Sequence, residues 1–241
     1  MTFKDKLFMN RDELLQEGPL TIVAFGDSIT HGAVGEGEID YESVYWNRLR
    51  KKILNIRNYV PINVINAGIG GISANGSLAR LEKQVLRYHP DLIIICFGLN
   101  DVNGELSTFL SALKIIFEKC KSCGATVVYM TPNMLNTYVA EDTPQKHLEY
   151  AKKTADMQIS GKMDLFIDSA IKLAKEMEIL VCNCYHEWKE LSQTKDTTLL
   201  LANRINHPIR EMHELFAQML FNCLFPNLNT IRHKENDSVM Y

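Results

Sequence analysis

The sequence predicts an α/β fold: a three-layer α/β/α sandwich around a five-stranded parallel sheet in the strand order 2-1-3-4-5. The first observation behind this prediction is a set of short apolar runs rich in Ile and Val, which is typical of parallel strands buried on both faces. The second is that segments with helical periodicity alternate with these runs. The third is the length of 241 residues, with 46% hydrophobic residues, which suits one globular domain over residues 1–241.

The predicted strands and helices follow one another in a regular order. The apolar runs predict strands at residues 21–25, 60–66, 92–97, 125–131 and 179–184. Helices are expected at about 42–54, 75–88, 106–122 and 162–177, with a last one after Pro208. Gly124 follows the third helix as a C-terminal signal, and right-handed crossovers place every strand-to-helix turn on one sheet edge. We expect a core over about 20–222 and a polar tail at 227–241.

Residues 132–160 interrupt this alternation, because they form a connection longer than ordinary strand-to-helix loops. Part of the segment, over about 147–157, has helical character. One interpretation is a lid or an acyl-pocket wall in which Met134, Leu135 and Tyr138 face the site. The other is a solvated surface insertion, and the sequence does not decide between the two.

Composition and charge narrow the classes of partner. The formal net charge is −3 and no basic stripe is visible, so no nucleic-acid partner is expected. No apolar run approaches the roughly 18 residues that a membrane helix needs, so no integral membrane association is expected. Residues 1–18 lack the apolar centre of a signal peptide, which favours a cytoplasmic location. The oligomeric state has no sequence signature.

The chain contains six cysteines, which we expect to be free thiols in a reducing compartment. Cys120 with Cys123, and Cys182 with Cys184, suggest a zinc site, but their spacing does not match the usual zinc-binding patterns. Cys182 and Cys184 are instead expected to alternate along the last strand, packing as small hydrophobic residues. No metal is therefore expected.

Polar and glycine-rich turns follow the first three predicted strands. The first turn is Gly26-Asp27-Ser28, the second contains Gly71 and the third contains Asn100. On a parallel sheet these turns adjoin one another at one edge, where open α/β sheets bind their ligands. Ser28 supplies a hydroxyl, a glycine supplies an unobstructed backbone N–H, and Asn100 supplies a side-chain amide. Asp27 and Asp101 are expected to bond turn amides rather than to act as catalysts.

A serine nucleophile also needs a base, and seven histidines are present. His207 stands just before the last predicted helix, at a point that returns the chain to the sheet edge. His31 is close to Ser28 in sequence and is expected to line the pocket rather than to reach the hydroxyl. The remaining histidines lie in helical or polar contexts: His89, His147, His186, His213 and His233.

Taken together, Gly26-Asp27-Ser28, Gly71, Asn100 and His207-Pro208 resemble the four sequence blocks of the GDSL or SGNH hydrolase family, in order and spacing. The resemblance implies a flavodoxin-like hydrolase fold and a serine esterase or acylhydrolase that acts on small-molecule esters, most readily short acyl or acetyl esters. It further implies that Ser28 is the nucleophile and His207 the base. The oxyanion hole would consist of the Ser28 and Gly71 backbone N–H groups and the Asn100 side chain, with no metal or cofactor.

One departure from the family pattern concerns the group that orients the histidine. The family usually carries an aspartate three residues before the histidine, and Arg204 occupies that position here. The Arg204 carbonyl, Asn203 and Asp196 are the remaining candidates for a third member. The departure also leaves an alternative function open, a catalytically weak or silent protein that binds acyl or glycan ligands. Gly68-Ile69-Gly70 hints at dinucleotide binding, but it follows the second strand and lacks the third glycine, so no cofactor is expected.

Overall fold

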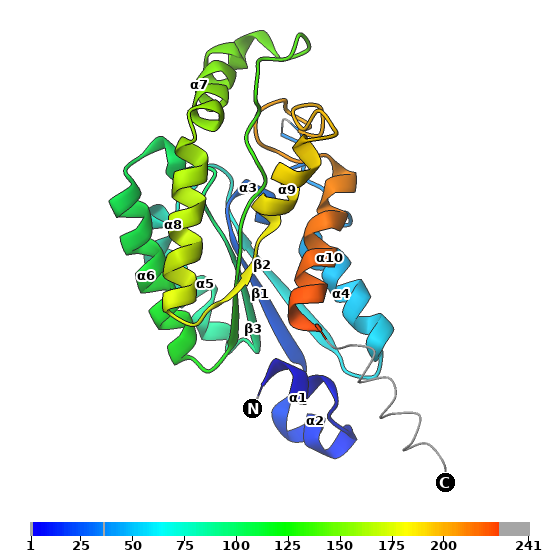
Figure 1. Cartoon of the computed structure of the whole chain (residues 1–241). Coiled ribbons are helices and arrows are strands. Elements are labelled where there is room, and N and C mark those ends of the chain that lie inside the picture. The colour runs from blue at the N-terminus through cyan, green and yellow to red at the C-terminus, as the bar shows by residue number, and fades with distance from the viewer. Residues whose placement is uncertain (1, 36, 227–241) are drawn as a thin grey trace.

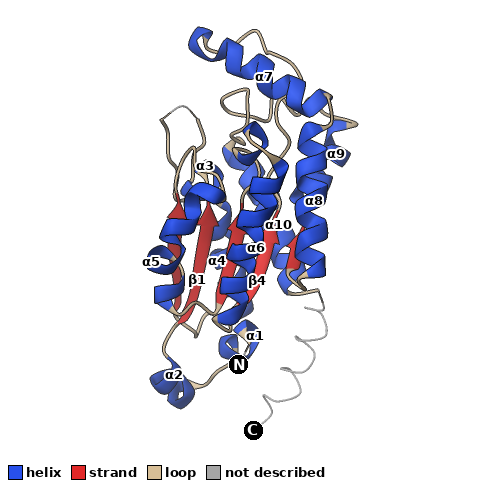
Figure 2. Ribbon diagram, turned by 90° about the vertical axis from the view of Figure 1, so that its left-hand side faces the viewer, coloured by secondary structure: helices blue, strands red, loops and turns tan. Residues whose placement is uncertain are grey.

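The computed structural model describes residues 2–35 and 37–226 and contains the predicted five-stranded parallel sheet in the order β2-β1-β3-β4-β5. All neighbouring strands are parallel, so their carboxyl ends meet at one edge, at the top in Figures 1 and 2. The predicted tail at 227–241 lies outside the described residues. The strands are β1 (Leu20–Gly26), β2 (Ile62–Gly68), β3 (Leu92–Cys96), β4 (Thr126–Met130) and β5 (Leu180–Cys182).

Helices cover both faces of the sheet, which gives the expected three layers (Figure 2). The helices α4 (Tyr45–Ile56) and α10 (His213–Leu224) pack together on one face. On the other face, α6 (Leu106–Ser122) packs against α8 (Lys162–Glu176), and both bounds nearly match the prediction. This division follows from right-handed crossovers, because the chain moves one way from β1 to β2 and the other way afterwards.

The helix expected at 75–88 is instead three short segments: η1 (Asn75–Arg80), α5 (Leu81–Gln84) and η2 (Leu86–Tyr88). The reason lies in Arg80, whose buried guanidinium turns inward under the sheet edge. It donates to the carbonyls of Ala67 at 2.6 Å and Gly26 at 3.0 Å, where β2 and β1 end. These bonds join the two strand ends that precede the predicted catalytic turns.

The amino-terminal residues form two helices that were not predicted, α1 (Phe3–Leu7) and α2 (Arg11–Glu17). Both begin with a capping box, at Thr2 and at Asn10, so the sequence does carry a signal for them. Phe3 and Leu7 are buried, and the hydrophobic core therefore begins before residue 20. Lys6 adds a bond of 3.1 Å to Asp91, the residue that precedes β3.

The cysteines are free thiols, as expected, but the last predicted strand is shorter than expected. Strand β5 ends at Cys182, and an unpredicted helix, α9 (Cys184–Ser192), begins two residues later. Asn183 causes this change, because its side chain caps α9 by accepting a bond from His186 N. Cys182 and Cys184 thus do not alternate along a strand, although both are buried and their sulfur atoms lie 3.6 Å apart.

The long connection at 132–160 runs along the top of the molecule and ends in η4 (Gln145–His147) and α7 (Leu148–Ile159), the green helix at the top of Figure 1. Its first part packs against the chain around residue 205. Asn136 N donates to Ile205 O at 2.9 Å, and Asn133 Nδ2 donates to Asn206 O at 3.0 Å. The connection is therefore attached to the segment that carries His207, rather than projecting freely into solvent.

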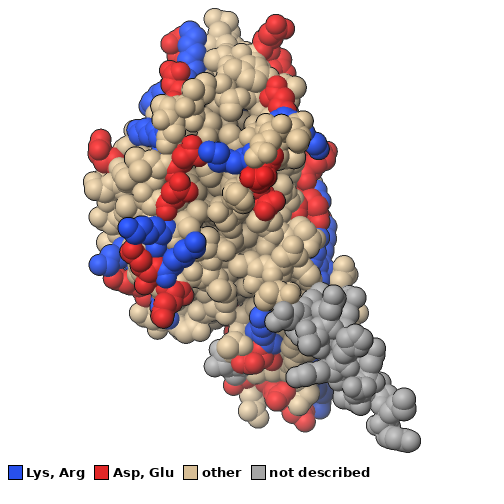
Figure 3. All heavy atoms as spheres, in the orientation of Figure 1, with Lys and Arg blue, Asp and Glu red and all other residues tan. Residues whose placement is uncertain are grey.

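The surface in Figure 3 carries Lys and Arg side chains among Asp and Glu side chains, so both signs of charge are mixed on this face. Among the helices of residues 2–35 and 37–226, none has the length and hydropathy needed to cross a bilayer.

Candidate active site

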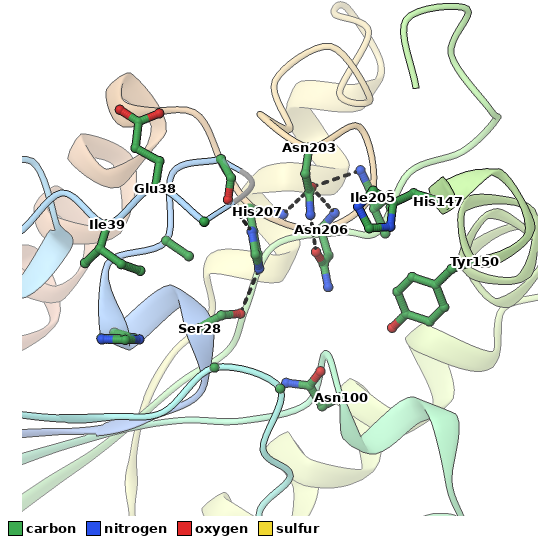
Figure 4. Close-up of a pocket in the computed structure, with 16 residues that line it drawn as sticks. Ser28, Glu38, Ile39, Asn100, His147, Tyr150, Asn203, Ile205, Asn206 and His207 are labelled. Carbon is green, nitrogen blue, oxygen red and sulfur yellow. Dashed lines mark hydrogen bonds between the residues drawn. The ribbon is translucent and has the colours of Figure 1, made fainter. Parts of the chain in front are cut away.

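A pocket of about 390 Å³ lies at the carboxyl edge of the sheet and contains all four predicted site residues. Ser28, Gly71, Asn100 and His207 line it, and they come from the turns after β1, β2 and β3 and from the segment before α10 (Figure 4). The prediction that these distant segments meet at one edge thus agrees with the geometry. His31 also lines the pocket, as expected.

Ser28 is held at the first position of a short helix, α3 (Ser28–His31). Asp27 caps that helix, because its Oδ1 accepts a bond of 3.0 Å from Ile29 N. Gly26 is required at the end of β1, since a Cβ there would overlap the Thr30 side chain and the Cys96 carbonyl. The strand therefore passes directly into a tight turn that presents the serine hydroxyl to the pocket.

His207 lies beside that hydroxyl, with its Nε2 2.9 Å from Ser28 Oγ. The segment carrying it is a compact turn built on Asn203, whose Oδ1 accepts bonds from the backbone N–H groups of Ile205, Asn206 and His207. Burial lowers the pKa of His207 below the ordinary imidazole value of 6.5, opposed by the bond to a backbone carbonyl. The ring is thus neutral at neutral pH, the form that can accept a proton.

The group beside the other ring nitrogen is none of the three candidates. The backbone carbonyl of Gly35 lies 3.4 Å from His207 Nδ1. Arg204, in the left-handed region with φ of 57°, sends its side chain outward to an ion pair with Asp142 at 2.8 Å. Asp196 accepts a bond from the Tyr138 hydroxyl at 2.6 Å. A neutral main-chain carbonyl, rather than a carboxylate, therefore lies beside Nδ1 of His207.

Asn100 and Gly71 complete the edge of the pocket opposite His207. Asn100 Nδ2 donates to Ile72 O at 3.1 Å and to Asp27 Oδ2 at 3.3 Å, so its amide is fixed between the first and second turns. In Figure 4 its nitrogen side faces the glycine turn below Ser28. Gly71 has a φ of 74°, which other residues rarely adopt, and this conformation shapes the turn beside the serine.

Two buried carboxyl groups lie behind these residues, in the structural roles expected for them. Asp101 Oδ1 accepts a bond of 2.8 Å from Ala74 N, which fixes the turn that follows β2. Burial raises the pKa of Asp27 to about 7, and the negative charge of Asp101 adds to the rise. Burial likewise raises the pKa of Asp101 to about 6. The site therefore carries carboxyl groups that titrate near neutral pH.

The connection at 132–160 contributes to the pocket, but not through the residues expected. Met134 and Leu135 are buried, and Tyr138 is exposed and bonded to Asp196 instead of facing the site. The lining residues from this segment are His147, at the end of η4, and Tyr150, in the first turn of α7 (Figure 4). The pocket-wall interpretation thus fits the segment but not its named residues, because the apolar ones pack into the core.

Comparison with known proteins places these observations in a family. Residues 24–215 match the family model of the GDSL-like Lipase/Acylhydrolase family. A curated relative, the uncharacterized lipoprotein YqeF of Bacillus subtilis (strain 168), is 34% identical over 80 residues. That match covers 33% of this chain and only 31% of the relative's length.

Solved structures with low sequence identity share the fold. The acetylxylan esterase Axe2 from Geobacillus stearothermophilus has a TM-score of 0.66 and 21% identity, covering 85% of this chain and 94% of that chain. LAE5, an alpha/beta hydrolase enzyme from the metagenome of Lake Arreo, has a TM-score of 0.64 and 18% identity with the same coverage. Since the family match extends from β1 into α10 and spans most of the chain, this protein belongs to the GDSL-like lipase/acylhydrolase family.

Proposed function

We propose that this protein is a serine esterase that hydrolyses carboxylic esters with short acyl groups through an acyl-serine intermediate. The observation that carries the proposal is the 2.9 Å contact between Ser28 Oγ and His207 Nε2 inside the pocket. Membership of the GDSL-like lipase/acylhydrolase family supports the reaction class. The proposed chemistry uses protein groups and water only.

In the first step, His207 Nε2 accepts the proton of Ser28 as the serine oxygen attacks the carbonyl carbon of the ester. The Gly35 carbonyl accepts a hydrogen bond from the Nδ1–H group, which selects the tautomer with an unprotonated Nε2. When the tetrahedral intermediate collapses, His207 returns the proton to the leaving alcohol oxygen. The alcohol departs and the acyl group stays on Ser28. Water, deprotonated by the same nitrogen, then attacks the acyl carbon, and His207 returns that proton to Ser28 Oγ as the acid is released.

The negative charge of the tetrahedral intermediate would be held by the backbone N–H groups of Ser28 and Gly71 and by Asn100 Nδ2. The two backbone donors are fixed by the turns that carry them, so they can act without reorganising during the reaction. The bonds of Asn100 Nδ2 to Ile72 O and Asp27 Oδ2 keep the amide nitrogen beside the glycine turn. Since an amide nitrogen has only two N–H groups, one of these bonds is exchanged for the bond to the oxyanion.

The pocket favours a small acyl group joined to a polar alcohol. Its volume of about 390 Å³ is near the lower end of ligand pockets, which suits an acetyl or similarly short chain. Glu38, Asn203 and Tyr150 add polar groups to the lining, beside the apolar Ile39 and Ile205. The structurally similar Axe2 is an acetylxylan esterase, which agrees with an acetylated, hydroxyl-rich substrate.

The proposal is tested by hydrolysis of p-nitrophenyl acetate and butyrate and of acetylated sugars. Wild-type protein should release p-nitrophenol, and the Ser28→Ala variant should fall to the background rate while keeping its melting temperature. A fluorophosphonate probe should add its mass to the peptide that contains Ser28. Equal rates for wild type and Ser28→Ala on every substrate would instead favour the silent acyl- or glycan-binding protein, for which the neutral partner of His207 is the supporting observation.

A further inference from the structure

We infer that Arg210 is a positioning residue that holds the Gly35 carbonyl against His207 and so takes over a task that relatives give to an aspartate. The inference rests on the proposed esterase function. It concerns the segment formed by residues 32–35 and 37–40, which we call the strap. The strap contributes Gly35, Glu38 and Ile39 to the pocket.

The two arms of the strap run antiparallel, with Ala33 paired to Ile39, and the first arm begins directly after α3. Ala33 N donates to Ser28 O at 2.9 Å, which attaches its first arm to the serine. Asp40 N donates to Gly32 O at 2.8 Å, and Val34 N donates to Glu38 O at 3.0 Å. These bonds join the two arms up to Val34. Gly35 follows immediately, so the place of its carbonyl depends on where the second arm is held.

Arg210 holds that second arm from the histidine side. Its Nε donates to Asp40 Oδ2 at 2.9 Å, and its Nη2 pairs with Glu38 Oε1. Arg210 begins η5 (Arg210–Met212), three residues after His207, and both residues therefore lie on the same short stretch of chain. The Arg210 guanidinium thus links the stretch of backbone that carries the His207 ring to the strap arm that positions the Gly35 carbonyl.

The energetics favour a positioning role over a contribution to folding. The side chains of Arg210 and Glu38 are 44% and 55% exposed, and exposed ion pairs of this kind add about 0–1 kcal/mol to stability. The contact between the Gly35 carbonyl and His207 Nδ1 is more sensitive to a displacement of the strap. The Gly35 carbonyl lies 3.4 Å from His207 Nδ1, near the limit for a hydrogen bond, so a small outward shift of the strap would break it.

The test compares Arg210→Met and Arg210→Lys with Lys51→Met as the matched control. Lys51 forms an exposed pair with Glu42 at 3.0 Å, so its replacement removes one positive charge nearby without touching the strap. Arg210→Met should lower kcat for p-nitrophenyl acetate by about 10-fold or more, since small misplacements of catalytic groups cost this much, with KM changing far less. Arg210→Lys should recover part of the loss, and Lys51→Met should match wild type.

A spectroscopic measurement separates this inference from the proposed function. In protein labelled with ¹⁵N-histidine, the His207 Nδ1 resonance, assigned with His207→Gln, should shift in Arg210→Met and stay in place in Lys51→Met. If wild type hydrolyses no ester, the esterase proposal fails, while this spectrum still tests the link from Arg210 to His207. An Arg210→Met variant with wild-type kcat and an unchanged Nδ1 resonance would overturn the inference. The inference would also fail if the losses in kcat from Arg210→Met and Glu38→Gln simply added in the double variant. Two substitutions that break the same link should have less than additive effects.

Discussion

Replacing Asp27 by Asn should make the protein more stable at pH 8 and less active. The side chain is fully buried beneath the pocket, where its Oδ1 caps α3 and its Oδ2 accepts a bond of 3.3 Å from Asn100 Nδ2. An asparagine keeps the capping oxygen but turns an N–H₂ group toward the Asn100 amide. The substitution therefore removes a buried charge and, at the same time, loosens a proposed oxyanion donor.

The magnitude follows from the pKa of Asp27, which burial raises from 3.8 to about 7. The folded state thus holds the proton more tightly than the unfolded chain, so the free energy of unfolding falls as pH rises from about 4 to about 7. A rise of this size corresponds to about 4 kcal/mol of lost stability at pH 8. The lost bond to Asn100 costs about 1 kcal/mol in return, which leaves Asp27→Asn about 3 kcal/mol more stable than wild type.

The assay is urea unfolding of both proteins at pH 4.5 and pH 8. At pH 4.5 most of the Asp27 carboxyl is already protonated in folded wild type, so the two stabilities should nearly coincide there. At pH 8 the variant should unfold at higher urea concentration, while both proteins keep the smaller pH dependence that comes from Asp101, whose pKa is about 6. A stability difference that stays constant between the two pH values would refute the reasoning.

Three further predictions concern the site and its support. Asn100→Ala should lower kcat about 10²–10³-fold with little change in KM, and steady-state kinetics showing the reverse pattern would assign Asn100 to substrate binding. Arg80→Met removes the bonds to Ala67 O and Gly26 O and should destabilise the fold by about 2–4 kcal/mol, which an unchanged urea midpoint would contradict. Because burial lowers the pKa of His207, kcat/KM should fall on the acid side with a midpoint below 6.5, and a pH–rate profile with a higher midpoint would be inconsistent with that assignment.

The strands β1, β3 and β4 could be predicted from the sequence because they are almost entirely buried and appear as continuous apolar runs. The edge strands β2 and β5 are less buried, and their bounds differ more from the predicted ones. The helix at Leu106–Ser122 was equally visible, since its apolar periodicity ends at Gly124. The broken segment around Arg80 was not, because its course depends on carbonyl groups of two distant strands. The capping boxes that begin α1 and α2 are local sequence patterns, so these two helices are also predictable from the sequence.

Among the site residues, too, those that stand in local sequence patterns could be predicted, and those placed by long-range packing could not. Ser28 and His207 stand in recognisable local patterns, and their side chains meet as expected. Gly35 could not have been found, because a backbone carbonyl is present at every residue and carries no side-chain signature. The wall residue Tyr150 was missed because its position depends on how the 132–160 connection folds. The cytoplasmic location and the absence of a nucleic-acid partner stay predictions.

The Arg204 side chain points away from His207 and pairs with Asp142, and this has a consequence for protein engineering. An obvious attempt to strengthen the proposed esterase would introduce an acid at this position with a single Arg204→Asp exchange. Arg204 now donates to Asp142 and to the Leu199 and Leu201 carbonyls, so the exchange would set two like charges near each other and leave those oxygens without their donor. Any such redesign would have to neutralise Asp142 as well. It would gain a carboxylate beside the histidine segment only by losing the bonds through which Arg204 ties that segment to Asp142 and to the residues around 200.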